Sequence, residues 1–76
     1  MIEILFFSHL QETVGAPKIT WTEVPISVGQ LKQTLAEKYS LRLNTVMTGV
    51  NEEYADDNLI LQIGDIVSFI PPVSGG

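Results

Sequence analysis

The chain has 76 residues and a mass of 8.4 kDa, which is enough for one small domain and leaves no room for a second hydrophobic core. A 45% hydrophobic and 17% charged composition is that of a globular protein, and the absence of cysteine excludes a disulfide framework, a thiol nucleophile and a thiolate metal site. The formal net charge of -5 argues against a nucleic-acid or anionic membrane surface.

No apolar run reaches the roughly 18 residues that a membrane-spanning helix needs. No basic segment precedes the first apolar residues, as it would in an export signal. We therefore expect a cytoplasmic domain that acts through partners.

Residues 2–8, with the sequence IEILFFS, predict a first strand because they are short, apolar and rich in strand-forming types. Side chains alternate along a strand, so Ile2, Ile4 and Phe6 share one face and Phe7 lies on the other. Both faces are apolar, so the strand is either sandwiched within the protein or presents its second face to something else.

Residues 9–15 are compatible with a helical turn or with a loop. Residues 18–24 alternate again, with Ile19 and Trp21 expected to point inward. This pattern predicts a second strand, antiparallel to the first.

Residues 25–40 predict the main helix. Ser27 stands at the N-cap with Gln30 three residues later, which is a capping box. An apolar stripe at helical spacing is expected to face the core; it consists of Val28, Leu31, Leu35 and Tyr39.

The second half of the chain predicts shorter elements. Residues 45–50 are expected to form a third strand and residues 54–55 a short return strand after a turn. Residues 59–61 are an apolar segment expected to tuck under the sheet, and residues 66–70 are the last strand. Val67 and Phe69 share its inward face.

These elements together predict an α+β fold with a mixed four- to five-stranded sheet and one main helix packed on one face. The first and last strands are the most apolar, so we expect them to pair in parallel at the sheet centre. This arrangement is the β-grasp, or ubiquitin-like, architecture. It occupies residues 1–70, and residues 71–76 form an extended tail.

The tail reads PPVSGG. Pro71 and Pro72 lack N–H donors and hold the backbone extended, so the tail is expected to leave the sheet as a stiff projection. Gly75 and Gly76 have no Cβ, which allows the chain end to thread into a narrow cleft of another protein. A carboxylate delivered in this way is open to activation as an acyl adenylate.

The segments MIEILFFS, GVNEEY, GDIV and PPVSGG occur in the same order in the MoaD family. The chain resembles these small, ubiquitin-like sulfur carrier subunits of molybdopterin synthase over essentially its whole length. The longer PPVSGG ending is more specific than a terminal Gly-Gly, which ubiquitin and the thiamine-pathway carrier share.

The resemblance implies that an E1-like enzyme adenylates the carboxylate of Gly76 with ATP and Mg²⁺. A sulfur donor protein then replaces AMP to give a thiocarboxylate. The tail delivers this sulfur to cyclic pyranopterin monophosphate in the large synthase subunit. The resemblance also implies a heterotetramer. We expect this chain to bind no metal and no cofactor, because it has no cysteine, no calcium-loop pattern and no glycine-rich phosphate loop.

Three large side chains are predicted to form a docking patch for the adenylating enzyme and the large subunit. Phe7 and Ile70 face away from the helix by parity, and Tyr54 joins them from the return strand. The alternative is that the three fill a second small cluster inside the monomer. Four tail residues complete the expected contact: Pro71, Pro72, Val73 and Ser74.

Other interpretations remain open. The chain is compatible with a carrier for thiamine or tRNA thiolation, with a ubiquitin-like modifier that forms isopeptide bonds, or with an interaction domain whose final glycines are incidental. His9 is the only histidine and has no triad partner. The acidic residues form either a solvated hairpin or a contact with a basic partner; they are Glu52, Glu53, Asp56 and Asp57.

Overall fold

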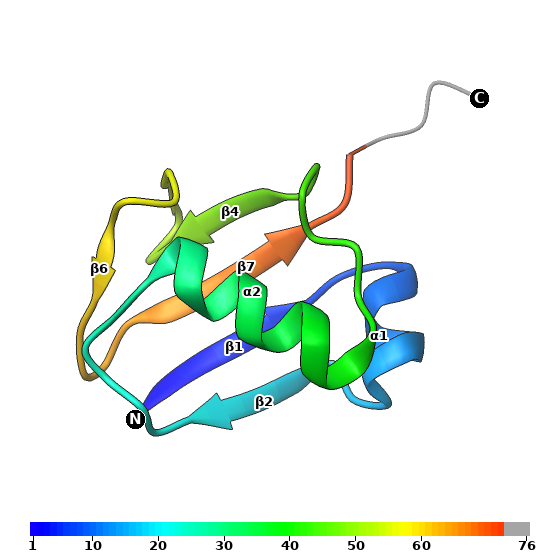
Figure 1. The fold of residues 1–76 in the computed structure, drawn as a ribbon, viewed down its shortest axis with the longest axis horizontal. Coiled ribbons are helices and arrows are strands. Elements are labelled where there is room, and N and C mark those ends of the chain that lie inside the picture. Colours follow the sequence, from blue (N-terminus) through cyan, green and yellow to red (C-terminus); the bar gives the residue numbers. More distant parts are fainter. Residues whose placement is uncertain (73–76) are drawn as a thin grey trace.

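The computed structural model describes residues 1–72 (Figure 1). Its elements in chain order are β1 (Ile2–Phe6), α1 (His9–Val14), β2 (Lys18–Trp21), β3 (Ile26–Ser27), α2 (Val28–Tyr39), β4 (Met47–Val50), β5 (Glu53–Tyr54), β6 (Ile60–Leu61) and β7 (Ile66–Ile70).

Five strands form one sheet in the order β2-β1-β7-β4-β5. The first and last strands, β1 and β7, pair in parallel at its centre, and the other neighbours are antiparallel. The helix α2 crosses one face of this sheet (Figure 1). The predicted mixed sheet with one main covering helix, a β-grasp fold, is confirmed.

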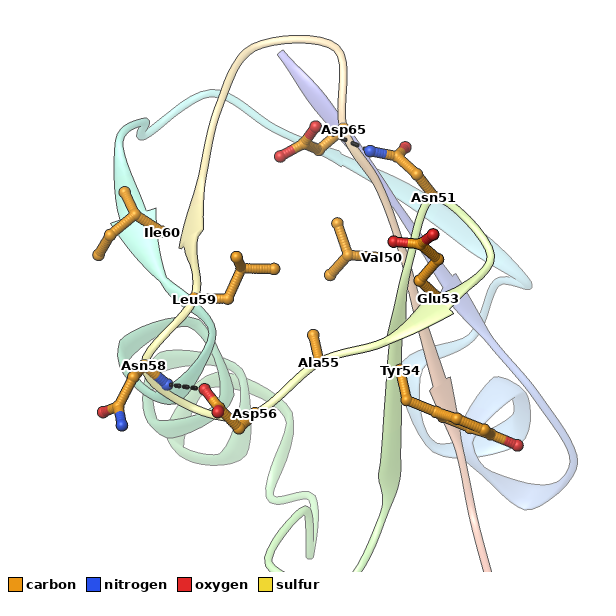
Figure 2. A pocket seen from close by; sticks show the side chains of 10 residues that line it. All are labelled: Val50, Asn51, Glu53, Tyr54, Ala55, Asp56, Asn58, Leu59, Ile60 and Asp65. Atoms are coloured by element: carbon orange, nitrogen blue, oxygen red, sulfur yellow. Dashed lines mark hydrogen bonds between the residues drawn. The ribbon is translucent and has the colours of Figure 1, made fainter.

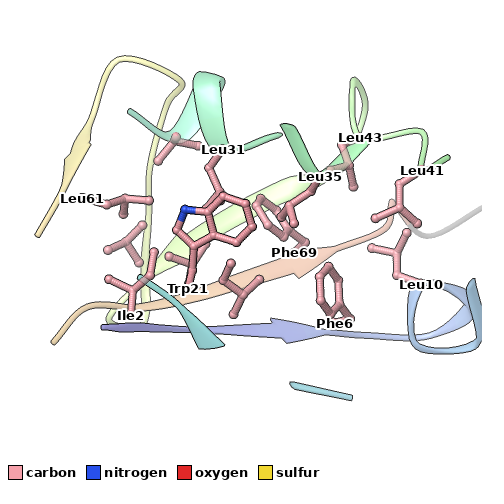
Figure 3. Close-up of a cluster of buried hydrophobic side chains, with 14 residues drawn as sticks. Ile2, Phe6, Leu10, Trp21, Leu31, Leu35, Leu41, Leu43, Leu61 and Phe69 are labelled. Carbon is pink, nitrogen blue, oxygen red and sulfur yellow. The ribbon is translucent and has the colours of Figure 1, made fainter. Parts of the chain in front are cut away.

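The core lies between α2 and the sheet (Figure 3). Its fully buried members include Ile2, Ile4 and Phe6 of β1, Val67 and Phe69 of β7, and Val28, Leu31 and Leu35 of α2. The rings of Phe6 and Phe69 pack with centroids 6.1 Å apart. The predicted inward faces of both central strands are therefore confirmed. Tyr39, the last member of the predicted helical stripe, is only partly buried at the edge of this core.

The main helix begins at Val28, directly after the predicted N-cap Ser27, although the predicted segment opened at residue 25. Ser27 has extended backbone angles and its Oγ accepts a hydrogen bond from the Gln30 N–H at 3.1 Å, while Gln30 Oε1 accepts from the Ser27 N–H at 3.4 Å. The capping box is confirmed. Because a cap residue is not helical, the preceding Ile26 is free to join a strand.

Residues 59–61 contribute to a second sheet and also reach the core. β6 pairs with β3 in a separate two-stranded sheet, with Leu61 opposite Ile26. Leu61 is fully buried in the main core, as expected for this apolar segment, whereas Leu59 and Ile60 are 41% and 50% exposed. The Val28 N–H also donates to the Leu59 carbonyl at 2.9 Å. The free N–H groups at the start of α2 and the extended residues before it thus hold this segment beside the helix.

The ambiguous residues 9–15 form the short helix α1. It ends at Gly15, which has φ 89° and whose N–H donates to the Gln11 carbonyl at 2.8 Å. A positive φ of this kind favours glycine. Leu10 of α1 is buried and closes one end of the core.

Candidate functional site

The sheet face opposite α2, called the outer face below, carries large apolar side chains that the monomer leaves exposed. Phe7 is 41% exposed, Tyr54 78% and Ile70 36%. The parity prediction for Phe7 and Ile70 is confirmed. The alternative of a second internal cluster does not fit these exposures.

Strand register adds further members to this face. Met47 lies opposite Ile70, and Ile66 lies opposite Glu3; the two apolar side chains are 42% and 41% exposed. Leu5, two residues before Phe7, is partly buried on the same face. We therefore define the outer apolar face as Leu5, Phe7, Met47, Tyr54, Ile66 and Ile70.

The predicted docking patch contained neither Ile66, which shares the outward side of the last strand with Ile70 by parity, nor Met47. Parity within one strand was enough to find Ile66. Finding Met47 required knowing which residue it faces on the neighbouring strand, and that pairing is fixed by tertiary structure.

The middle of the outer face is hollow because the residues there have small side chains. One register row runs from Leu5 through Ser68 and Gly49 to Tyr54. A depression of about 550 Å³ lies on this face, and Leu5, Phe7, Ile66 and Ser68 help to line it. An apolar anchor on a partner protein would be desolvated there, which is how interface anchors commonly contribute to affinity.

The tail starts at the edge of this face. The Phe7 N–H donates to the Phe69 carbonyl at 3.4 Å, which brings Phe7 to the last residues of β7. After Ile70 the strand ends, Pro71 is partly buried and Pro72 is exposed. The other predicted tail residues, Val73, Ser74, Gly75 and Gly76, lie outside the described residues.

The hairpin that presents Tyr54 is held firmly. Asn51 and Glu52 have φ of 52° and 70°, as in the two-residue type I′ turn. Asn51 donates from Nδ2 to Asp65 Oδ1 at 3.0 Å, and its Oδ1 accepts from the Ile66 N–H at 3.0 Å. These bonds connect the β4–β5 hairpin, which carries Tyr54, to the start of β7.

Of the four acidic residues that the sequence groups together, Asp57 differs from the other three in its contacts. Asp57 pairs with Lys32 of α2 at 3.1 Å, and its carbonyl accepts from the Gly29 N–H at 3.0 Å. Asp56 accepts from the Asn58 N–H at 2.9 Å. Glu52 and Glu53 lie on the hairpin and are exposed. Asp57 therefore anchors its loop to the helix, and the other three remain available to solvent.

Residues 1–72 contain no group of three or more His, Cys, Asp or Glu side chains that could hold a metal ion. Within the same residues, no helix is long and apolar enough to cross a bilayer. His9 begins α1 and is exposed.

The fold and its outer apolar face define a ubiquitin-like β-grasp protein that presents an apolar sheet surface beside the end of its last strand. The chain belongs to the ThiS family, whose model matches residues 4–76.

Named relatives agree with the sequence resemblance. The chain is 34% identical to the molybdopterin synthase sulfur carrier subunit of Escherichia coli (strain K12), with all of both chains covered. It is 35% identical to the protein of the same name from Drosophila melanogaster, covering 99% of this chain and 90% of that protein. The resemblance to sulfur carrier subunits of molybdopterin synthase is confirmed.

Two of the solved structures with similar folds share more than 25% sequence identity with this chain. The HVO 2177 protein of Haloferax volcanii superposes with a TM-score of 0.84 and 29% identity, covering 99% of this chain and 85% of that one. A chain in the complex of subunits 1 and 2 of the molybdopterin-converting factor from Helicobacter pylori 26695 has a TM-score of 0.72 and 27% identity. The match covers 99% of this chain and 97% of that one.

Proposed function

We propose that this protein is the sulfur carrier subunit of a molybdopterin synthase and that Gly76 carries the sulfur. The observation that carries the proposal is the joint presence of the Gly75-Gly76 ending and an exposed apolar sheet face beside the strand that leads to it. The similarity of this chain to sulfur carrier subunits over its full length also supports the proposal.

In this proposal the carboxylate of Gly76 attacks the α-phosphorus of ATP, with Mg²⁺, in an E1-like enzyme, and pyrophosphate leaves. A hydrosulfide ion supplied by a donor protein then attacks the carbonyl carbon of the acyl adenylate and expels AMP, so a C–S bond replaces the C–O bond to AMP. A carboxylate alone is a poor electrophile, so the phosphate leaving group is what makes the exchange feasible. The product is a thiocarboxylate, a soft anionic sulfur nucleophile at neutral pH.

The thiocarboxylate sulfur then replaces an oxygen substituent of cyclic pyranopterin monophosphate in the large subunit, which links carrier and pterin through a thioester. Water attacks the carbonyl carbon of this thioester, so the sulfur stays on the pterin and the carrier leaves as a carboxylate. Two successive carriers supply the two sulfurs of the dithiolene. Covalent attachment raises the effective concentration of sulfur at the acceptor. The two glycines suit this task because no side chain blocks the approach of the backbone to a narrow site.

The carrier docks on its partner protein through the outer apolar face, so that the tail enters the partner's active site. Phe7, Tyr54 and Ile70 are the proposed anchors, with Met47 and Ile66 widening the contact. Pro71 and Pro72 favour an extended backbone, which limits the entropy lost when the tail is inserted. The proposed partners are the large synthase subunit, the E1-like adenylating enzyme and the sulfur donor.

The test is co-purification with candidate partners followed by intact mass measurement. We expect a pterin-binding large subunit to co-purify and the carrier mass to increase by the replacement of one oxygen with one sulfur. One residue added after Gly76 should abolish this change, and one added before Met1 should not. Conjugates to lysine would instead indicate a protein modifier, and a thiolated carrier that ignores the large subunit would indicate another sulfur pathway.

A further inference from the structure

A second concave surface lies at the edge of the sheet, between the β4–β5 hairpin and the segment that leads into β6 (Figure 2). This edge groove is open to solvent and has a volume of about 600 Å³. The Leu59 and Val50 side chains point toward each other across it, with Ala55 beside them (Figure 2). Leu59 is 41% exposed, so the groove has an apolar floor that is open to a ligand.

The polar lining of the edge groove carries charge of one sign. Three carboxylates line it: Glu53, Asp56 and Asp65. Asp65 accepts hydrogen bonds from the Asn51 side-chain amide and the Gln62 N–H, and Asp56 accepts from the Asn58 N–H. All these donors are neutral, so they orient the carboxylates without compensating their charge.

The ion pairs within residues 1–72 involve carboxylates outside the groove. They join Lys18 to Glu3 on the outer face and Lys32 to Asp57 beside α2. No lysine, arginine or histidine is among the residues that line the groove. The described part of the chain therefore leaves three negative charges around an apolar floor without a cationic partner.

A long cationic side chain matches both properties of this groove. The methylene stem of Lys or Arg packs on apolar surface while its charged head reaches polar groups, and here Val50 and Leu59 would take the stem and the carboxylates the head. A metal ion suits the groove less well, since no metal-binding group of three side chains exists in residues 1–72. A nucleic acid would be repelled by a chain of net charge -5.

The groove adjoins the outer apolar face across a single edge strand. Glu53 and Tyr54 are consecutive in β5; Glu53 pairs with Val50 and Tyr54 with Gly49, so their side chains lie on opposite sides of the sheet. The Tyr54 ring points away from the groove floor (Figure 2). A protein that docks around Tyr54 on the outer face can therefore reach the groove by passing over β5.

We propose that the edge groove receives a Lys or Arg side chain of the large synthase subunit when that subunit docks on the outer apolar face. This inference rests on the proposed function, because it takes the docking partner from there. The charged contact adds specificity and association rate to the affinity that the apolar face supplies.

The test measures the affinity of the large subunit for four variants of the full chain, alongside the unmodified chain, by calorimetry at low and high salt. Glu53→Lys should raise the Kd about fivefold to tenfold at low salt, and Glu53→Gln about twofold to fivefold. Glu37→Lys makes the same charge change on the exposed face of α2 and should leave the Kd unchanged. Phe7→Asp reports on the outer face, and thermal unfolding followed by circular dichroism verifies that each variant is folded.

A loss of affinity in Phe7→Asp and Glu53→Lys but not in Glu37→Lys, with the Glu53 effect shrinking at high salt, supports the inference. If Phe7→Asp loses affinity while Glu53→Lys matches Glu37→Lys, the groove is not part of the interface and the proposed docking face stands. If Phe7→Asp binds like the unmodified chain, the docking face and the inference that rests on it are both overturned.

Discussion

Met47 of β4 and Ile70 of β7 lie opposite each other in the antiparallel register, and both side chains face away from α2. Ile70 is the last residue of its strand and is followed directly by Pro71. The outer apolar face therefore extends to the point where the chain leaves the sheet. A partner that contacts this pair is positioned to receive the tail that begins at Pro71.

The first prediction concerns Met47. Met47→Lys should weaken binding of the large subunit about tenfold or more, because a charge would be buried against an apolar partner surface. The free energy of unfolding should change little, since Met47 is 42% exposed. Calorimetric titration and urea denaturation measure the two effects. Ile63→Lys is the matched control: Ile63 is 77% exposed and is not part of the outer apolar face.

The second prediction contrasts two neighbouring phenylalanines. Phe7→Asp should abolish docking while the domain stays folded, because Phe7 is 41% exposed. Phe6→Ala should instead lower the free energy of unfolding by about 3–5 kcal/mol, since Phe6 is buried against Phe69 and its truncation leaves a cavity. Urea denaturation and a pull-down with the large subunit separate the two outcomes. Equal stability losses in both variants would contradict the assignment of faces.

The third prediction concerns the close contact between α2 and the loop before β6. A Cβ at Gly29 would lie 3.2 Å from Asp57 Cβ and 3.3 Å from the Asp57 carbonyl oxygen. That oxygen accepts from the Gly29 N–H, and Lys32 holds the Asp57 side chain, so the loop has little freedom to retreat.

Gly29→Ala should therefore destabilise the domain by about 1–3 kcal/mol, despite the higher helix propensity of alanine. Gln33→Ala, at an exposed position of the same helix, should be neutral or slightly stabilising. Thermal unfolding of both variants measures the difference. A Gly29→Ala protein as stable as the Gln33→Ala protein would show that the loop yields freely.

The fourth prediction concerns the turn between β4 and β5. Glu52 has φ 70°, which costs energy for a residue with a Cβ, and type I′ turns favour Asn followed by Gly. Glu52→Gly should raise the free energy of unfolding by about 1 kcal/mol. Glu52→Ala keeps the Cβ and should give no such gain, which separates backbone strain from the removal of charge. Urea denaturation compares the three proteins.

The amino-acid sequence determined the local features of this protein. Alternation in residues 2–8 and 66–70 predicted which side chains of the two central strands enter the core, and Ser27 with Gln30 predicted the cap of the main helix. Phe7 and Ile70 were found in the same way. These properties depend on neighbours within a few residues, so periodicity and capping patterns are sufficient to predict them.

Only the tertiary structure decided how distant segments meet. Residues 26–27 pair with residues 60–61, Met47 lies opposite Ile70 on the outer face, and Asp57 forms an ion pair with Lys32 of α2. Each of these contacts joins residues more than 20 positions apart. Such pairings follow from the packing of the whole chain around one core, and no local pattern contains them.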